Sequence, residues 1–401
     1  MGAVSGADRV IVVGAGPTGL ATALGLARSG IPVTVLESEP AIVRSPRAAV
    51  YHWAVLDGLD RLGILEDAIR AGFTNPELCI HVPKKGAQIR LNIGVLAGEV
   101  THPYQVHLGQ DRLGDIALEH LERLPGTRIE WSTRVTGLTQ DSSGVTLQAA
   151  TPDGPRMHRA AWVVGADGGR SAVRQGLGLA MDGMTWPERF VATNIRYDFA
   201  RYGYAPANVV IDSPHGAIVA LLDHTGLWRC TYCEDASLPE EGVLERMPAY
   251  FAGALPGEKR YELVQYSPYR MHQRCADRMR LGRVLLAGDA AHLTNPTGGL
   301  GLTSGLYDAY VLYEALAAVI RGEADETVLD RYSEERRRAF LEHASPEASN
   351  FKRMIYHLKD ETEIEAQLAG FRAAESDQSL QRLIFLTAKK LQTPSLVHRE
   401  R

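Results

Sequence analysis

Three glycines near the N-terminus have the spacing of a phosphate-binding turn. Gly14, Gly16 and Gly19 follow a short apolar segment and precede a run of Leu and Ala, so they occupy a strand-to-helix turn. Glycines let backbone N–H groups approach a diphosphate closely, and the N-terminus of a helix favours negative charge. Glu37 ends the next apolar segment, where a carboxylate suits the hydroxyl groups of a ribose. The pattern predicts a dinucleotide site.

Two further glycine–acid segments are candidates for the same site. Asp167 and Gly168 follow the apolar run 162–165, and Asp289 follows the similar run 284–287. Acids at the carboxyl ends of strands lie where the ligands of open α/β sheets bind. The glycine-rich segment 296–301 then opens a long helical pattern, whose positive end can face an anion. Taken singly, each segment is explained equally well by a structural turn.

Other reactive side chains form weaker patterns. Cys230 and Cys233 form a C-x-x-C pair, but the pair falls inside an alternating, strand-like segment, so we expect neither a redox nor a metal role. The charged run 334–338 is typical of a solvated helix face. The G-x-S-x-G and H-E-x-x-H patterns of common hydrolases are absent from the sequence.

Hydrophobic patterning predicts the elements that position these residues. Segments 9–13, 17–29 and 32–36 predict a strand, a helix and a strand, which is a βαβ unit with a right-handed crossover and a parallel sheet. The rest of the first half is expected to contain helices at 52–62, 64–71 and 111–123 and strands at 78–82, 88–93 and through 128–164.

The pattern changes after residue 182. Alternating segments at 190–197, 208–211, 217–222, 228–232 and 261–266 predict an antiparallel sheet with one helix near 240–253. A strand at 283–287 and helices at 300–320 and 327–343 resume the first pattern, and the last 50 or so residues are helix-prone without an obvious site.

Composition narrows the class of protein. The 401 residues are 45% hydrophobic and 23% charged, which suits a globular protein of two or three domains and excludes a disordered chain. A net charge of −5 argues against nucleic acid as the partner. Residues 10–36 are long and apolar enough for a membrane span, but Arg28 and Pro32 interrupt them, so no membrane partner is expected. Four cysteines favour a reducing, cytoplasmic location.

In this order and spacing, the three glycine–acid motifs resemble those of the single-component flavin aromatic hydroxylases. This is the family of p-hydroxybenzoate hydroxylase and of the phenol and hydroxypyridine monooxygenases. The resemblance covers residues 9–343 and implies non-covalent FAD, with NADH or NADPH as co-substrate. Leu300 and Thr303 stand where family members often carry Gln and Asn, so the backbone path of that loop is better supported than its hydrogen bonds to the flavin.

The resemblance also implies which residues bind FAD. The glycines of the first motif and Glu37 would hold the ADP half, and Arg47 and Gln110 match positions that contact the cofactor. Asp167 would act in an Asp-Gly motif, and Asp289 would bond the ribityl chain. The expected set is Gly14, Gly16, Pro17, Thr18, Gly19, Glu37, Arg47, Gln110, Asp167, Gly168, Asp289, Pro296, Gly299, Leu300, Gly301 and Leu302.

The implied chemistry is the hydroxylation of an aromatic ring. No protein side chain activates O₂, so a flavin must carry that step. A reduced flavin adds oxygen to give a hydroperoxide, an electrophile that suits a small phenolic or hydroxypyridine-type ring. The sequence therefore predicts an FAD-dependent, NAD(P)H-consuming monooxygenase. Two alternatives stay open: a flavin-dependent dehydrogenase that inserts no oxygen, and a non-catalytic flavoprotein that acts as a sensor or scaffold.

Such a reaction needs a general base, and His52 is the candidate. It lies shortly after Arg47 in a region that lines the ring pocket in the family, and the ordinary pKa of histidine is close to neutrality. The competing interpretation is a packed histidine on a helix face. His292 is expected to support its loop. The substrate residues are expected to be His52, Tyr204, Arg229, Tyr232 and Pro296.

The alternation of patterns divides the chain. Residues 1–72, 102–181 and 269–345 are expected to form a discontinuous FAD-binding domain, and residues 73–101 and 182–268 a substrate-binding domain. Residues 346–401 would form a C-terminal helical segment. The predicted fold class is α/β, a Rossmann-like FAD-binding domain with an inserted antiparallel-sheet substrate domain and C-terminal helices. The sequence leaves a homodimer open.

Overall fold

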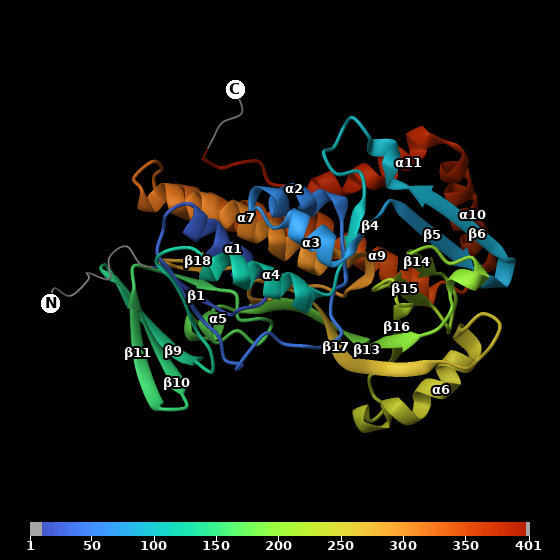
Figure 1. The fold of residues 1–401 in the computed structure, drawn as a ribbon, viewed down its shortest axis with the longest axis horizontal. Helices are drawn as coiled ribbons and strands as arrows, with labels where there is room; N and C mark the ends of the chain where they lie inside the picture. The colour runs from blue at the N-terminus through green and yellow to red at the C-terminus, as the bar shows by residue number, and fades with distance from the viewer. Residues whose placement is uncertain (1–9, 398–401) are drawn as a thin grey trace.

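The computed structural model describes residues 10–397, and two large sheets organise it (Figure 1). The first sheet has six strands, of which five are parallel and the edge strand β18 is antiparallel. Its central strands β1 and β2 are short, β-branched and buried, as expected for a parallel sheet covered on both faces. Its order is β18 (Arg280–Leu281), β19 (Val284–Leu286), β12 (Trp162–Gly165), β1 (Val10–Val13), β2 (Val33–Leu36) and β8 (Thr127–Glu130).

Helix α1 (Pro17–Arg28) connects β1 to β2, which confirms the predicted βαβ unit. Pro17 occupies its first turn, where the missing N–H removes no helical bond, and Gly30 leaves it with a φ of 78°. α4 (Gln110–Glu122) and α7 (Leu300–Ile320) pack beside it.

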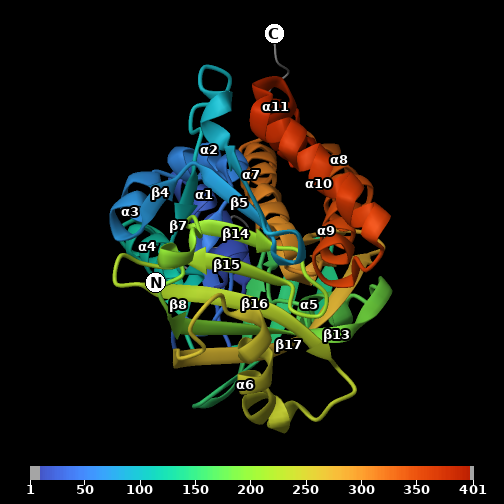
Figure 2. The ribbon, with the colours of Figure 1, turned by 90° about the vertical axis from the view of Figure 1, so that its right-hand side faces the viewer.

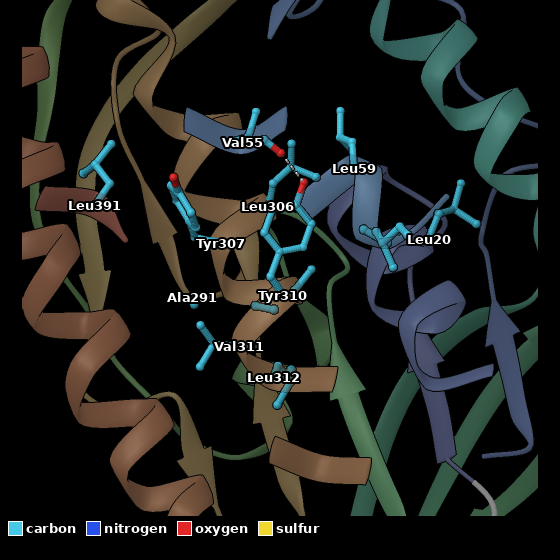
Figure 3. Close-up of a cluster of buried hydrophobic side chains, with 14 of the residues drawn as sticks. Leu20, Val55, Leu59, Ala291, Leu306, Tyr307, Tyr310, Val311, Leu312 and Leu391 are labelled. Carbon is cyan, nitrogen blue, oxygen red and sulfur yellow. Dashed lines mark hydrogen bonds between the residues drawn. The ribbon is translucent and has the colours of Figure 1, made fainter. Parts of the chain in front are cut away.

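Helix α7 forms the centre of the main hydrophobic core. Figure 3 shows its side chains beside Leu20 of α1 and Leu59 of α2 (Trp53–Arg61). The Tyr310 hydroxyl donates to the backbone oxygen of Val55 at 3.1 Å, and the Tyr307 hydroxyl donates to that of Ala54 at 2.5 Å. These bonds fix the first turn of α2, and with it the segment that carries His52.

The second sheet has eight strands and is antiparallel except for the β14–β5 pair. In that pair the β5–β6 hairpin, from an earlier part of the chain, joins the strands after residue 180 through a connection long enough for parallel pairing. The order is β20 (His292–Leu293), β17 (Glu262–Ala276), β13 (Met181–Arg196), β16 (Leu227–Asp235), β15 (Ala217–Leu221), β14 (Ala207–Val210), β5 (Glu77–Val82) and β6 (Ala87–Asn92).

Two strands of this sheet are much longer than their sequence patterns predict. β13 has 16 residues and β17 has 15. The register between them shifts between Thr185 and Arg189, next to Pro187, and Pro268 lies inside β17. Proline and a register shift interrupt the alternation of side chains, so the sequence shows only part of each strand.

Smaller elements complete the architecture. The sheet of β9 (Arg134–Asp141), β10 (Gly144–Thr151) and β11 (Gly154–Ala160) projects from the first region (Figure 1). β3 (Val50–Tyr51), β7 (Gln105–His107) and β4 (Phe73–Asn75) form another sheet. The remaining helices of the first half are α3 (Leu65–Ala71) and α5 (Ala172–Gly176), and α6 (Val243–Ala254) covers one face of the eight-stranded sheet (Figure 2).

The C-terminal part is helical, as predicted, and lies against the edge of the eight-stranded sheet that ends in β6 (Figure 2). Two π-helical turns interrupt it on either side of α9. Its elements are α8 (Thr327–Ala339), a π-turn (Phe340–Ala344), α9 (Ser345–Lys352), a second π-turn (Arg353–His357), α10 (Glu361–Ser376), α11 (Gln378–Leu386) and a 3₁₀ turn (Thr387–Leu391). Within residues 10–397, no helix is both long and apolar enough to cross a bilayer.

Candidate functional site

A cavity of about 570 Å³ opens at the carboxyl ends of β1, β2 and β12. This is the edge at which open α/β sheets bind ligands. The turns after these strands, the start of α4 and part of the β9 strand form its walls. Of the residues predicted to bind FAD, it is lined by Gly14, Gly16, Pro17, Glu37, Arg47, Gln110, Asp167, Gly168 and Asp289.

The three glycines of the first motif have different roles. A Cβ atom on Gly14 would lie 2.3 Å from the Ala166 oxygen, and one on Gly19 would lie 2.0 Å from the Gly14 oxygen. These two glycines therefore permit close packing of the chain on itself. Gly16 has an ordinary φ of −71°, and among residues 10–397 no atom other than those of its chain neighbours lies within 4 Å of its hypothetical Cβ. The packing of these residues does not require glycine at position 16, so the open space beside it fits a closely bound diphosphate.

Glu37 is held rigidly at the cavity wall. Its carboxylate accepts hydrogen bonds from the backbone N–H of Ala15 at 2.7 Å and of Glu39 at 2.9 Å. The Ser38 hydroxyl donates to the same carboxylate at 3.0 Å. A carboxylate with a fixed orientation beside the glycine turn fits a ribose of a dinucleotide.

Asp167 lines the cavity and also caps α5. It accepts hydrogen bonds from the Ser171 hydroxyl at 2.5 Å and from the Val173 N–H at 3.1 Å. Burial raises the pKa of its carboxyl, and these bonds oppose the change. Arg174 donates to the oxygens of Ala290 and Gly169, at 2.9 and 3.0 Å, so one guanidinium joins the second and third motifs.

Asp289 lies on the turn Gly288–Ala290, directly after β19. Its side chain is exposed to the cavity, yet protein surrounds it closely enough that burial raises the pKa of the carboxyl. A polar group in such a place stabilises a bound partner that offers hydrogen-bond donors, and the hydroxyl groups of a ribityl chain are donors of this kind.

The glycine loop and the other predicted FAD residues do not line the cavity. Gly298 and Gly299 have φ values of 84° and 71°, and α7 begins after them without a side-chain cap. Thr18 packs against Gly288, whose hypothetical Cβ would lie 2.7 Å from the Thr18 hydroxyl oxygen. The predicted residues outside the cavity wall are Thr18, Gly19, Pro296, Gly299, Leu300, Gly301 and Leu302.

His52 precedes α2 in an extended conformation, next to β3. Its Nδ1 atom is buried and has no hydrogen-bond partner among residues 10–397, and the same holds for the Tyr51 hydroxyl and the Trp53 Nε1. Burial lowers the pKa of His52 to about 4, so the imidazole is neutral at pH 7. Buried polar atoms are normally paired, so the unpaired Nδ1 of His52 is available to a ligand or to water.

The side chain of Arg229, in β16, points toward Arg47, which lines the cavity. Its Nε donates to the Asn194 side-chain oxygen at 2.7 Å, and its Nη1 donates to the backbone oxygen of Arg47. Burial lowers its pKa to about 10 although the charge of Asp111 opposes this change, and no carboxylate among residues 10–397 forms an ion pair with it. The guanidinium of Arg47 lies 5.9 Å from the centre of the Tyr269 ring. The sheet thus presents a buried cation toward the FAD side.

Tyr232 and Tyr204 do not lie with Arg229. Side chains alternate along a strand, so Tyr232, three residues after Arg229, points to the opposite face. There it stacks on Tyr250 of α6 at 3.8 Å between ring centres. Tyr204 stacks on His81 at 3.9 Å and belongs to the same buried cluster as Tyr232. Both are core residues beneath α6, so we exclude them from the candidate substrate residues.

The remaining candidates are structural. Cys230 and Cys233 are unpaired thiols on opposite faces of β16, and burial raises the pKa of Cys230 to about 12. His292 lies 2.7 Å from the Asp308 carboxylate and stacks on Phe340, which confirms its supporting role.

The prediction of a solvated face at 334–338 is wrong for Arg336, which is fully buried. Arg336 lies one helical turn after the buried Tyr332, so it shares the inner face of α8. A charged residue on that face is tolerated because Asp308 pairs with it. Charge alone could not reveal this partner, which is distant in the sequence.

Comparisons with known proteins identify the family of the chain. The model of the FAD binding domain family matches residues 8–344. The chain is 43% identical to para-nitrophenol 4-monooxygenase of a Pseudomonas species, over 96% of both chains. It is 44% identical to 6-hydroxy-3-succinoylpyridine 3-monooxygenase HspB of Pseudomonas putida, over 88% of this chain and 90% of the relative.

Solved structures show the same fold. The crystal structure of p-nitrophenol 4-monooxygenase PnpA from Pseudomonas putida aligns with a TM-score of 0.92 and 43% identity, over 96% of this chain and 98% of that one. Aklavinone-11 hydroxylase, solved with FAD and aklavinone, aligns with a TM-score of 0.77 and 30% identity, over 87% of this chain and 69% of that one. The chain therefore belongs to the FAD binding domain family and, within it, to the FAD-dependent aromatic monooxygenases.

Proposed function

We propose that the protein hydroxylates a small phenolic or hydroxypyridine-type ring, with O₂ as oxidant and NADH or NADPH as electron donor. Two relatives that match most of the chain are named for reactions on para-nitrophenol and on a hydroxypyridine. Both of these rings carry a hydroxyl group, so an oxygen-bearing ring is the shared chemistry. The neutral, unpaired His52, which lies five residues after the cavity-lining Arg47 and outside the cavity wall itself, is the observation that carries the proposal on the protein side.

The residues around the cavity fit FAD. The space beside Gly16 would receive the diphosphate, Glu37 the ribose of the ADP half, and Asp289 the ribityl hydroxyls. The segment 296–301 would lie beside the ring system, with its two left-handed glycines. When bound, the reduced flavin supplies the activation of O₂ that no side chain can provide.

His52 would accept the proton of the ring hydroxyl. A base must be unprotonated at the working pH, and a pKa of about 4 keeps the imidazole neutral; because the same shift makes it a weaker proton acceptor, the transfer also needs a group that stabilises the ring anion. For Nδ1 to be the acceptor, the proton of the neutral ring must lie on Nε2. Deprotonation places negative charge on the ring, and a more electron-rich ring reacts faster with an electrophilic oxygen.

Arg229 would stabilise that negative charge. It is a buried cation without a carboxylate partner, and its bond to the Arg47 oxygen holds it at the boundary between the sheet and the FAD region. A charge-assisted hydrogen bond in a buried site is stronger than a neutral one. His52 and Arg229 would thus act on the substrate as proton acceptor and anion partner.

The variant His52→Ala tests the proposal. We expect it to keep FAD and substrate-stimulated NAD(P)H oxidation but to lose about 10²–10⁴-fold in hydroxylation rate, the usual contribution of a general base. The oxidation would then release peroxide instead of product. Raising the pH above the substrate's own pKa should restore part of the yield, because the ring then ionises in bulk water.

His102→Ala is the matched control. This histidine lies near Asp57 and Asp60 of α2, at 3.6 and 3.7 Å, so its loss disturbs the same helix without touching the base. An unchanged product yield for His52→Ala at neutral pH would reject the role of His52. Product formed under ¹⁸O₂ should gain one labelled oxygen, whereas a dehydrogenase product would gain none and a sensor would show no substrate-stimulated oxidation.

The proposal includes the organisation of the chain. We retain the predicted FAD-binding segments 1–72, 102–181 and 269–345 and the substrate-binding segments 73–101 and 182–268. The four unpaired cysteines support a reducing, cytoplasmic location. A homodimer stays open, and sedimentation of the purified protein would determine the oligomeric state.

A further inference from the structure

A fully buried carboxylate lies directly behind the turn that carries Asp289. Asp308 of α7 accepts hydrogen bonds from the Gly288 N–H at 2.9 Å and from the His292 Nε2 at 2.7 Å through one oxygen. Its other oxygen accepts from the Arg336 Nε at 2.8 Å. Asp308 and Arg336 are both fully buried, and their opposite charges stabilise each other. The pKa of the Asp308 carboxyl therefore lies below its usual value despite burial.

Arg336 extends this network to the C-terminal end of the chain. Its Nη1 donates to the Leu391 oxygen at 2.7 Å and to the Thr393 hydroxyl at 3.0 Å. Its Nη2 donates to the Ser304 oxygen at 3.2 Å. One guanidinium therefore connects α8, α7 and the segment after α11, and four of its hydrogen bonds have partners on other elements.

The turn Gly288–Ala290 is held from two sides. Gly288 has a φ of 60°, and a Cβ on it would lie 2.7 Å from the Thr18 hydroxyl oxygen in α1. On the other side, the Gly288 N–H is bound by Asp308. Asp289 is the next residue, so its position in the cavity depends on both neighbours.

The C-terminal arm, residues 361–393, is also attached at its other end (Figure 2). Glu375 of α10 accepts from the Arg90 N–H, and Gln381 of α11 accepts from the Asn92 N–H, both at 2.8 Å. Arg382 pairs with Glu99. The arm thus connects the β6 edge of the eight-stranded sheet to Arg336.

We infer that Asp308 and Arg336 are positioning residues for FAD, which hold the Gly288–Ala290 turn and make FAD affinity depend on the attachment of the C-terminal arm. The physical reason is the cost of a buried charge whose partner is lost. If Arg336 loses its bonds, Asp308 is no longer balanced and the turn relaxes. Asp289 then no longer faces the cofactor in the right place.

A double-mutant cycle on FAD affinity tests this inference. FAD is titrated into the flavin-free full-length proteins, followed by quenching of flavin fluorescence. We expect Arg336→Lys to weaken FAD binding by about 10-fold or more, in the range of one lost charged hydrogen bond. If Arg336 acts through Asp289, Arg336→Lys should weaken binding much less when Asp289→Ala is already present, because coupled residues are not additive. Additive losses would reduce Arg336 to a general structural role and overturn the inference.

Arg338→Lys is the matched control. Arg338 lies on the same helix but is exposed and pairs with Glu335, so its variant should bind FAD as the wild type does. Thr393→Val removes only one acceptor of Arg336 and keeps the test decisive if Arg336→Lys does not fold. A loss of about 3-fold or more with Thr393→Val, absent in the Asp289→Ala background, supports the inference. Unchanged affinity in a folded Thr393→Val protein overturns it.

Discussion

Arg229 of the eight-stranded sheet donates a hydrogen bond to the backbone oxygen of Arg47, 182 residues earlier in the chain. Arg47 lines the cavity, so this bond joins a buried cation of the eight-stranded sheet to the cavity wall. A group held at such a boundary can respond to both bound molecules. The relationship leads directly to a test of substrate binding.

Arg229→Ala should weaken binding of the aromatic substrate by about 10- to 100-fold, because one charged hydrogen bond in a buried site is lost. Arg229→Lys should recover part of the affinity, since lysine keeps the charge but lacks the planar fork. The perturbation of flavin absorbance on titration with substrate measures this. Arg196→Ala is the control, because Arg196 lies on the adjacent strand but is exposed and bonds to Thr225. Equal weakening in both variants would remove Arg229 from the substrate site.

Gly16→Ala should separate cofactor binding from folding. The backbone at Gly16 suits alanine, and no protein atom would meet the new methyl group. The flavin-free protein should therefore keep its melting temperature, while FAD affinity falls by about 10-fold or more because the diphosphate is pushed away.

Gly30→Ala is the control for Gly16→Ala, because its expected effects on folding and on FAD binding are the reverse. Gly30 has a φ of 78° and lies outside the cavity wall, so alanine there should lower the free energy of unfolding by about 1–2 kcal/mol and leave the FAD affinity of the folded protein unchanged. Calorimetry and FAD titration of the two variants measure both effects. Normal FAD affinity in Gly16→Ala would contradict the assignment of the diphosphate to this turn.

Asp289→Ala should reduce FAD affinity by about 10- to 150-fold, the range of a buried hydrogen bond to a charged group. Cys230→Ser and Cys233→Ser should keep their FAD, because both thiols lie in the eight-stranded sheet outside the cavity wall. Flavin content per protein chain and titration of flavin-free protein give the comparison. A similar loss in all three variants would show that the effect comes from folding and not from the ribityl site.

Two buried histidines predict an acid-sensitive fold. Burial lowers the pKa of both His52 and His107 to about 4, whereas an unfolded histidine has a pKa near 6.5. Between these values the unfolded chain binds protons that the folded chain does not, so the free energy of unfolding should fall as the pH drops from about 6.5 to about 4. Each group contributes up to about 1.4 kcal/mol per pH unit.

Urea unfolding at pH 7, 6 and 5 measures this slope. In His107→Asn the slope should be shallower, because one of the histidines with a strongly lowered pKa is gone. The pKa of the Asp308 carboxyl is lowered from its ordinary value of 3.8. This group therefore changes the free energy of unfolding only below that pH and not between pH 7 and pH 5. A free energy of unfolding that does not change between pH 7 and pH 5 would show that burial does not disfavour the protonated forms of His52 and His107.

The sequence was sufficient to predict much of the cavity wall because phosphate binding imposes a local pattern. A tight turn, close packing and a helix start all act within a few residues, so Gly14, Gly16 and Gly19 are recognisable without any tertiary information. The same holds for Asp167 and Asp289, which follow buried strands directly. Nine predicted residues indeed line one cavity.

The substrate residues were harder to predict, because whether a strand residue lies in the core or in a site depends on which face of the sheet other elements cover. The positions of Tyr232 and Arg229 predict opposite faces, but only the packing of α6 shows which face is core. Arg336 was missed for a related reason, since its partner Asp308 lies on another helix. Sequence patterns report the environment of a residue only when that environment is built by its near neighbours.

The hydrogen bonds that Glu375 and Gln381 accept from β6 affect how the chain behaves while it is being synthesised. β6 is the last strand of its sheet, and without the C-terminal arm the N–H groups of Arg90 and Asn92 would be open to pairing with another chain. The arm leaves the ribosome about 270 residues later, so the nascent protein carries an uncovered strand edge until translation is nearly complete. Variants that detach the arm should therefore aggregate during expression, even where the finished protein is stable.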